Sequence, residues 1–406
     1  MKNRKIEWVG KIPEHWNIKR IAAFYCLRNE KVSDRDYPPL SVTKKGILPQ
    51  LDTAAKSDDG DNRKLVHKGD FAINSRSDRR GSCGISDYDG SVSLINIVLK
   101  PRGEASNKYY NWLFHTEQFA DEFYKWGNGI VDDLWTTKWQ NMKKIIIPVP
   151  PLSEQKAIAG FLDKKCGEVD ALIADIQQEI ETLEQYKRSV ITEAVTRGLD
   201  PSVPMKESGI DWLGEIPMLW ETKRIAAFYQ LRNEKVSDKD FPPLSVTKQG
   251  VLPQLETVAK TDDGDNRKLV RKGDFAINSR SDRRGSCGIS DYDGSVSLIN
   301  IVLKPRDKAN NKYYNWLFHT EQFADEFYKW GNGIVDDLWT TRWQNMKKII
   351  IPVPPIENQQ KIADYLDKKC KEIEEIITEK QSQIETLESY KKSLIYEYVT
   401  GKKEVG

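Results

Sequence analysis

The pattern of apolar and polar positions divides each half of the chain into a region of short elements and one long amphipathic segment. Strand-like runs lie at residues 65–66, 70–74, 92–99 and 145–149, and turn signals such as Gly127-Asn128-Gly129 separate the elements. An aromatic and charged stretch at 107–126 is typical of a helix. Together these short elements predict an α+β globular region over residues 1–150.

A long helix is predicted to follow this region. Residues 145–149 run into Pro150 and Pro151, which stop a strand because proline has no backbone N–H and restricts its neighbour. Ser153 is the predicted N-cap of a helix that runs to about Arg197 and stops at Gly198. At 1.5 Å per residue this helix is roughly 65 Å long.

Apolar residues in this helix alternate at four- and three-residue spacing, which indicates a coiled-coil seam. The seam positions are Val169, Ile173, Ile176, Ile180 and Leu183 in the first helix, and Ile373, Ile377, Ile384 and Leu387 in a second helix near the C-terminus. Lys380 interrupts the second seam where the first has Ile176. Ordinary amphipathic packing of each helix on its own globular region remains the alternative.

The chain consists of two copies of one unit, and the copies align without a gap. Trp8 and Trp212 lie 204 positions apart, as do Ile21 and Ile225. This period is far longer than that of solenoid repeats, so it indicates domain duplication. Residues 68–102 are identical to 272–306, and residues 108–137 are identical to 312–341, whereas the helical segments have diverged.

The fold class predicted from these patterns is α+β, with two pseudo-twofold-related globular domains joined by two long antiparallel coiled-coil helices. The first helix leads directly into the second globular domain, whose last strand leads into the second helix, so the two helices must run in opposite directions. The predicted division is 1–152 and 201–356 for the globular domains, and 153–200 and 357–406 for the helices.

Composition excludes few classes of protein. The 63 Lys and Arg residues nearly balance the 61 Asp and Glu residues, so net charge does not identify a partner. The chain has no apolar run of the roughly 20 residues that a membrane helix needs and no signal-peptide pattern, which predicts a cytoplasmic protein without a membrane partner. Its five cysteines are widely spaced and form no CxxC pair, so free thiols are expected rather than a metal site.

Motifs for nucleotide chemistry are absent from the sequence. No GxxxxGK[ST] loop occurs and no GxGxxG follows a strand, so no cofactor is predicted for this chain. The four histidines have no metal-ligand spacing. His115 and His319 are matched, but each lies among aromatic residues, which favours packing over catalysis.

A charged loop after the predicted strand 70–74 is the first candidate for binding nucleic acid. Arginine binds guanine edges bidentately or holds phosphates, and small residues allow a close approach of the backbone. The candidates here are Asn74, Arg76, Ser77, Arg79, Arg80 and Ser82, repeated as Asn278, Arg280, Ser281, Arg283, Arg284 and Ser286. A solvated arginine–aspartate network is the alternative.

Two further segments carry hydroxyl, amide and basic side chains that could reach phosphates or bases. Residues 125–139 contain Asn128, Thr136, Thr137 and Lys138, matched by Asn332, Thr340, Thr341 and Arg342, although the tryptophans of this segment could equally belong to the core. Lys44 and Lys248 are candidate phosphate ligands. Their neighbour Lys45 becomes Gln249, which makes it a poor candidate for reading bases if the two halves are equal.

In its order of features the whole chain resembles the specificity subunit of type I restriction–modification systems. The residues that carry the resemblance are 10–16 (GKIPEHW), 68–70 (KGD) and 147–155 (IPVPPLSEQ) before the long helix, with a second copy of each. The second copy departs at Asn358-Gln359, which replaces Glu154-Gln155.

The resemblance implies a non-catalytic subunit that recognises double-stranded DNA through its two globular domains. It further implies that the helices set the spacing and dock two methyltransferase subunits, which restriction subunits then join. S-adenosylmethionine, ATP and magnesium would belong to those partners. Two near-identical readers on a twofold frame predict an inverted-repeat target.

Two other functions remain as alternatives from the sequence. The first is a coiled-coil scaffold whose duplicated domains bind proteins, and its binding to DNA would depend little on salt or sequence. The second is a nuclease acting without partner subunits.

Overall fold

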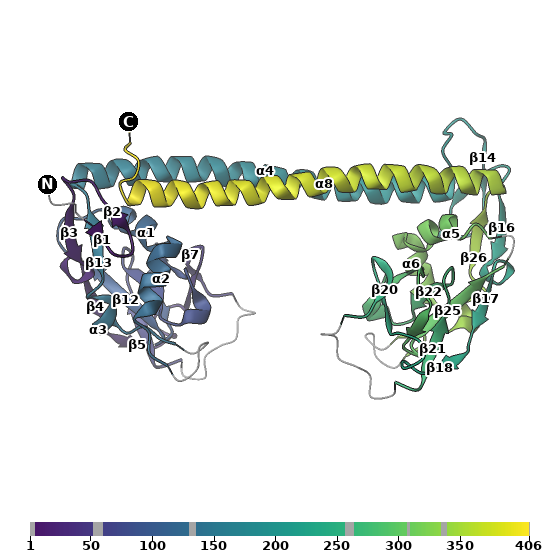
Figure 1. Ribbon diagram of the computed structural model, residues 1–406, viewed down its shortest axis with the longest axis horizontal. Helices are drawn as coiled ribbons and strands as arrows, with labels where there is room; N and C mark the ends of the chain where they lie inside the picture. The colour runs from purple at the N-terminus through teal and green to yellow at the C-terminus, as the bar shows by residue number, and fades with distance from the viewer. Residues whose placement is uncertain are drawn as a thin grey trace. The chain divides into compact units, whose positions relative to one another are not determined.

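The computed structural model describes residues 5–51, 60–129, 135–255, 264–306, 309–333 and 339–405. The chain forms two compact units (Figure 1). Unit 1 comprises Met1–Gln177 and Gln381–Gly406, and unit 2 comprises Gln178–Lys380. Each unit therefore contains one globular region and part of both long helices, so the units cut across the division expected from the sequence.

Antiparallel strands build the globular region of unit 1. A four-stranded sheet has the order β10 (Cys83–Ile85), β9 (Phe71–Asn74), β12 (Asn96–Pro101), β4 (Tyr25–Arg28), and a three-stranded sheet has the order β11 (Gly90–Val92), β8 (Arg63–Val66), β5 (Lys31–Val32). Two-stranded pairs are formed by β1 (Lys5–Ile6) with β2 (Gly10–Lys11), β3 (Asn17–Arg20) with β13 (Ile146–Val149), and β6 (Leu40–Thr43) with β7 (Gly46–Pro49).

The helices of this region correct two predictions. Instead of one helix over 107–126, the chain forms α1 (Asn107–Phe114) and α2 (Glu117–Lys125), followed by the short α3 (Trp139–Met142). The break occurs because the Thr116 side chain accepts a hydrogen bond from the Phe119 backbone and caps α2. The strand predicted over 92–99 is also two strands, since β11 ends at Val92 and β12 begins at Asn96.

Unit 2 repeats this arrangement in the same order. Its strands are β14 (Met205–Glu207), β15 (Glu215–Pro217), β16 (Glu221–Arg224), β17 (Tyr229–Arg232), β18 (Lys235–Val236), β19 (Leu244–Thr247), β20 (Gly250–Pro253), β21 (Arg267–Val270), β22 (Phe275–Asn278), β23 (Cys287–Ile289), β24 (Gly294–Val296), β25 (Asn300–Pro305) and β26 (Ile350–Val353). Its helices are α5 (Asn311–Phe318), α6 (Glu321–Lys329) and α7 (Trp343–Met346).

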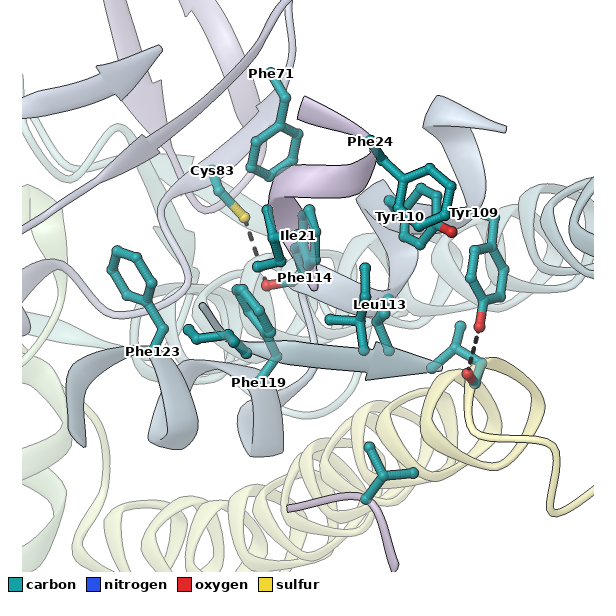
Figure 2. Close-up of a cluster of buried hydrophobic side chains, with 14 of the residues drawn as sticks. Ile21, Phe24, Phe71, Cys83, Tyr109, Tyr110, Leu113, Phe114, Phe119 and Phe123 are labelled. Atoms are coloured by element: carbon teal, nitrogen blue, oxygen red, sulfur yellow. Dashed lines mark hydrogen bonds between the residues drawn. The ribbon is translucent and has the colours of Figure 1, made fainter. Parts of the chain in front are cut away.

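The core of unit 1 contains a cluster of aromatic rings between the sheet and the helices (Figure 2). Phe114 stacks on Phe119 with ring centroids 4.4 Å apart and meets Phe71 edge to face at 5.2 Å. Aromatic pairs of this kind add to the stability gained from burial alone. Unit 2 repeats the cluster, with the ring centroids of Phe318 and Phe323 also 4.4 Å apart, so each globular region has its own core.

The two long helices are α4 (Leu152–Arg197) and α8 (Ile356–Val399). Helix α4 begins at Leu152, so the prediction that Ser153 is the N-cap is wrong and Ser153 lies within the first turn. It ends at the predicted stop, Gly198, which has φ +84° and so adopts a conformation that a residue with a Cβ rarely takes.

Within each unit the two helices run antiparallel. In unit 2, Lys187 of α4 lies 2.5 Å from Glu374 of α8, and Glu179, earlier in α4, pairs with Lys380, later in α8. In unit 1, Lys391 lies 2.6 Å from Asp170. Lys187 and Lys391 are matched residues of the repeat, so both units carry the same inter-helix ion pair.

Burial along the helices follows the seam pattern. Val169, Ile176, Ile180 and Ile373 are buried, and Ile173, Leu183, Ile377, Ile384 and Leu387 are half-buried, whereas their neighbours on the helices are mostly exposed. The first turns of α4 also pack on their own globular core through Ile158 and Leu162. Each helix therefore combines the two kinds of packing that the sequence left open.

Each globular region also holds the end of the helix from the other repeat. The Tyr109 hydroxyl of α1 donates to the Val399 carbonyl at the end of α8, at 2.8 Å (Figure 2). In unit 2 the Tyr313 hydroxyl donates to the Val195 carbonyl near the end of α4, at 2.7 Å. The exchange is reciprocal, and buried tyrosine hydroxyls secure it in both units.

Among the described residues, no helix is long and apolar enough to span a membrane. Over the same ranges, no group of three or more His, Cys, Asp or Glu side chains is arranged to hold a metal ion.

Candidate nucleic-acid interface

The charged loop after β9 is a compact turn. Residues Ser77–Arg79 form one turn of 3-10 helix, and the loop closes where the Asn74 backbone N–H donates to the Ser82 carbonyl at 2.8 Å. The Tyr124 hydroxyl of α2 donates to the Asn74 carbonyl at 2.9 Å. Burial also raises the pKa of Tyr124, and its hydroxyl links the loop to the helix through this hydrogen bond.

All three arginines of the loop have a carboxylate neighbour. Arg76 donates from Nε and Nη2 to the two carboxylate oxygens of Asp78, both at 2.9 Å. Arg79 lies 3.7 Å from Asp78, and Arg80 pairs with Asp121 of α2. The arginine–aspartate network offered as an alternative is therefore present, and it occupies the proposed binding residues themselves.

The loop and the second candidate segment form one surface. The backbones of Thr136 and Asn128 exchange hydrogen bonds at 3.1 and 3.2 Å, and Thr136 also forms a bridge with Arg76. The Ser77 N–H donates to the Trp135 carbonyl at 2.9 Å. Residues 130–134 of this segment lie outside the described residues. Arg76 and Thr136, which are 60 positions apart in the sequence (136 − 76), thus bring the two segments together.

Several candidate side chains are exposed on this surface. Arg79 and Arg80 expose 68% and 49% of their side chains, and Asn128 and Lys138 are exposed as well. Asn74, Arg76, Ser77 and Thr136 are half-buried. In unit 2 the matched Arg283, Arg284, Asn332 and Arg342 are exposed, and Asn278, Arg280, Ser281 and Thr340 are half-buried.

Four candidates do not fit a role as DNA ligands. Thr137 and Thr341 are buried, and the Thr137 hydroxyl donates to the Phe123 carbonyl at 2.8 Å, as that of Thr341 does to Phe327. Ser82 and Ser286 are each only 6% exposed. The threonine hydroxyls hold the second segment in place, and the serines bond within the loop through their backbones. Because all four side chains are buried, they do not reach a ligand from the surface.

Lys44 lies at the tip of the β6–β7 hairpin and lines one hollow with Arg80, Asp121 and the start of α2. The hairpin approaches β10 so closely that a Cβ on Gly84 would lie 2.8 Å from the Gly46 Cα, which requires glycine at position 84. Lys248 is exposed at the matched position of unit 2. The lysines therefore extend the basic surface beyond the arginine loop.

The partners that hold this surface together were not found from the sequence. Asp121 and Tyr124 are on α2, more than 40 positions from the arginines or carbonyls that they contact. No local pattern indicates such contacts. The only signal was their place in the block that is identical in both halves.

Comparisons with known proteins agree with this architecture. The family model for the type I restriction modification DNA specificity domain matches residues 14–182 and again 217–386. A putative type I restriction enzyme MjaX specificity subunit from Methanocaldococcus jannaschii is 24% identical, over 98% of this chain and 96% of that protein. The MjaVIII specificity subunit of the same organism is 26% identical, over 97% and 94%.

Two solved structures have a similar fold. A chain from a study of complex assembly and conformational transition of the type I R-M system matches with TM-score 0.73 and 15% identity, over 97% of this chain and 100% of that one. The HsdS subunit from Thermoanaerobacter tengcongensis matches with TM-score 0.54 and 16% identity, over 97% and 98%. Since the family model covers most of both halves, the chain belongs to the family of type I restriction–modification DNA specificity subunits.

Proposed function

We propose that this subunit recognises a bipartite DNA target whose two parts form an inverted repeat, one part for each arginine loop. The observation that carries the proposal is the equality of the loops. Arg76, Arg79 and Arg80 and their carboxylate partners recur in unit 2 with matching ion pairs. Equal side chains that form ion pairs with equal partners are expected to read equal bases, and a symmetric pair of readers selects an inverted repeat.

The chemistry of the surface supports contact with duplex DNA. Arginine recognises guanine O6 and N7 in the major groove, and lysine, arginine and backbone N–H groups hold phosphates. The exposed Arg79, Lys138 and Lys44 supply the basic part, and Asn128 supplies an amide that can pair with adenine. In this proposal residues 1–152 and 201–356 are the readers, and 153–200 and 357–406 are the helical spacers.

We also propose that the chain carries no catalytic residues and positions two methyltransferase subunits and the restriction subunits on the target. The support is the naming of its relatives as specificity subunits and the likeness to a chain from a type I assembly. S-adenosylmethionine, ATP and magnesium would be bound by those partners.

The test is to map methylated adenines in cells that express this chain with its methyltransferase. The expected result is methylation in a split motif whose two parts are inverted copies. A strongly asymmetric motif would contradict the symmetric target but leave DNA recognition intact. Duplex binding that is insensitive to sequence and salt would instead favour a scaffold, because phosphate contacts weaken steeply as salt rises.

A further inference from the structure

We propose that Asp78 and Asp282 are positioning residues that orient Arg76 and Arg280 for reading guanine, and that Arg79, Arg80, Arg283 and Arg284 contact phosphates. The proposal rests on the DNA-reading function proposed above. It assigns different roles to the three arginines of each loop, which the sequence alone does not distinguish.

Arg76 is the most constrained arginine of the loop. Its backbone N–H donates to the Asn74 side chain at 3.1 Å, and its backbone bridges to Thr136. Its guanidinium is held by Asp78 at two points, and 36% of its side chain is exposed. In unit 2 Arg280 repeats the backbone hydrogen bond at 3.1 Å, and its Nε lies 2.8 Å from Asp282 as an ion pair without a hydrogen bond. In unit 1 the backbone and the side chain of this arginine are therefore both fixed before DNA binds, and in unit 2 the ion pair keeps the arginine beside the matched aspartate.

The way in which Asp78 holds Arg76 matches what a guanine reader needs. A guanidinium has five N–H donors in a rigid plane, and Asp78 occupies the edge formed by Nε and Nη2. The edge between Nη1 and Nη2 has no partner among the described residues, and two parallel N–H donors on that edge fit guanine O6 and N7. Asp78 thus leaves the recognition edge available while it fixes the plane of the group.

The other two arginines are held less tightly. Arg79 lies 3.7 Å from Asp78 and is 68% exposed, and Arg80 pairs with Asp121, which is itself 68% exposed on α2. Exposed pairs of this kind contribute little and exchange readily for another anion. Phosphate contacts tolerate such freedom because they carry no base-specific geometry.

Preorganisation predicts opposite effects on target and non-target DNA. Arginine loses much rotamer freedom when it is fixed, and a side chain that is already fixed pays this cost before binding. Replacing Asp78 releases the guanidinium, which weakens reading of the target. The same replacement removes a negative charge close to DNA, which strengthens sequence-independent binding. A purely electrostatic role would strengthen both.

The experiment compares D78N/D282N with D121N/D325N in the full-length chain co-purified with its methyltransferase. Binding is measured to the duplex identified by methylation mapping and to a scrambled duplex at fixed salt. For D78N/D282N we expect about ten-fold weaker binding to the target and equal or tighter binding to the scrambled duplex. For D121N/D325N, the matched control with the same change of charge, we expect both affinities to rise together.

A double-mutant cycle separates positioning from damage to the loop. If Asp78 acts through Arg76, the D78N/D282N change does not weaken target binding further in an R76A/R280A background. A further loss there would mean that the carboxylates contact DNA themselves or hold the loop together, and it would overturn the proposal. An unchanged preference for the target in D78N/D282N would overturn it as well. If the unmodified protein shows no preference for the mapped duplex, the proposed function itself fails.

Discussion

The arginine loops are identical in sequence in the two units, whereas the junctions between each long helix and its globular region have diverged. In the loops even exposed side chains such as Arg79 and Arg283 are paired identically. At the junction of unit 1, His15 lies 2.9 Å from Glu154, and the Trp16 indole donates to the same carboxylate at 2.8 Å. In unit 2 the matched residues are Leu219, which is 84% exposed, and Asn358.

The difference separates what the fold needs from what the proposed function needs. The junctions keep their buried contacts, such as the tyrosine hydroxyls on the exchanged helix ends, while their exposed polar contacts have been replaced. Exposed side chains are seldom required for folding, because surface substitutions usually change stability by less than about 0.5 kcal/mol. Equality at exposed positions of the loops is therefore the feature that stability alone does not explain.

The largest effect is expected from removing the buried tryptophan of each junction. Trp16 is 0% exposed and Trp220 is 2% exposed, so W16A and W220A should each destabilise their own unit by about 3–5 kcal/mol. W16A should cost about 1 kcal/mol more than W220A, since Glu154 loses a donor.

Denaturant unfolding together with hydrogen exchange resolved by unit would measure both variants. The control is W126A, which removes a side chain that is 38% exposed and should cost little. Uniform loss of protection across both units in either variant would show that the units do not unfold separately, and it would contradict the comparison.

The next largest effect concerns the equality of the loops. R76A and R280A should each weaken binding to the mapped target by about 1–3 kcal/mol, and by the same amount, because each removes one base contact of the same kind. Titration of the two half-sites in separate duplexes would assign each loss to one loop. Unequal losses would break the argument that the two readers are equivalent.

The third effect lies at the diverged junction. E154A removes the acceptor of both His15 and Trp16 and should destabilise unit 1 by about 1–2 kcal/mol. N358A, at the matched and exposed position of unit 2, should change stability by less than about 0.5 kcal/mol. Thermal unfolding of both variants checks the contrast, and equal costs would mean that Asn358 has a structural role of its own.

Regular patterns made much of the fold predictable from the sequence. The 204-residue repeat, the seam spacing and the proline-bounded strand gave the two α+β regions and the long helices. The predictions failed where a single side chain redirects the backbone, as when Thr116 caps α2 and divides the expected helix. A cap of this kind competes with helix propensity over one turn and leaves no periodic signal.

The candidate site was predictable by residue type but not by arrangement. The arginines and Lys44 followed from charge and repetition. That Thr137 turns inward, and that Asp121 reaches Arg80, depends on contacts between segments distant in the sequence. Hydroxyl residues serve ligands and the backbone equally well, so their type alone does not say which role they have.

The smallest effect is a pH dependence that both units should share. Burial lowers the pKa of His115 and of His319, and the nearby Lys391 and Lys187 lower it further. Each ring Nδ1 lies 2.7 Å from a backbone carbonyl, of Asn111 or Asn315, to which the neutral ring donates.

A histidine with a lowered pKa binds fewer protons in the folded state than in the unfolded state, where its pKa is about 6.5. Stability is therefore full above that pH and falls as the pH drops below it, by at most about 1.4 kcal/mol per pH unit for each histidine. Unfolding resolved by unit and measured between pH 7 and 5.5 should show this slope lost in unit 1 for H115N and lost in both units for H115N/H319N. Stability that instead rises toward pH 5.5 in the unmodified protein would mean that the folded state favours the charged rings.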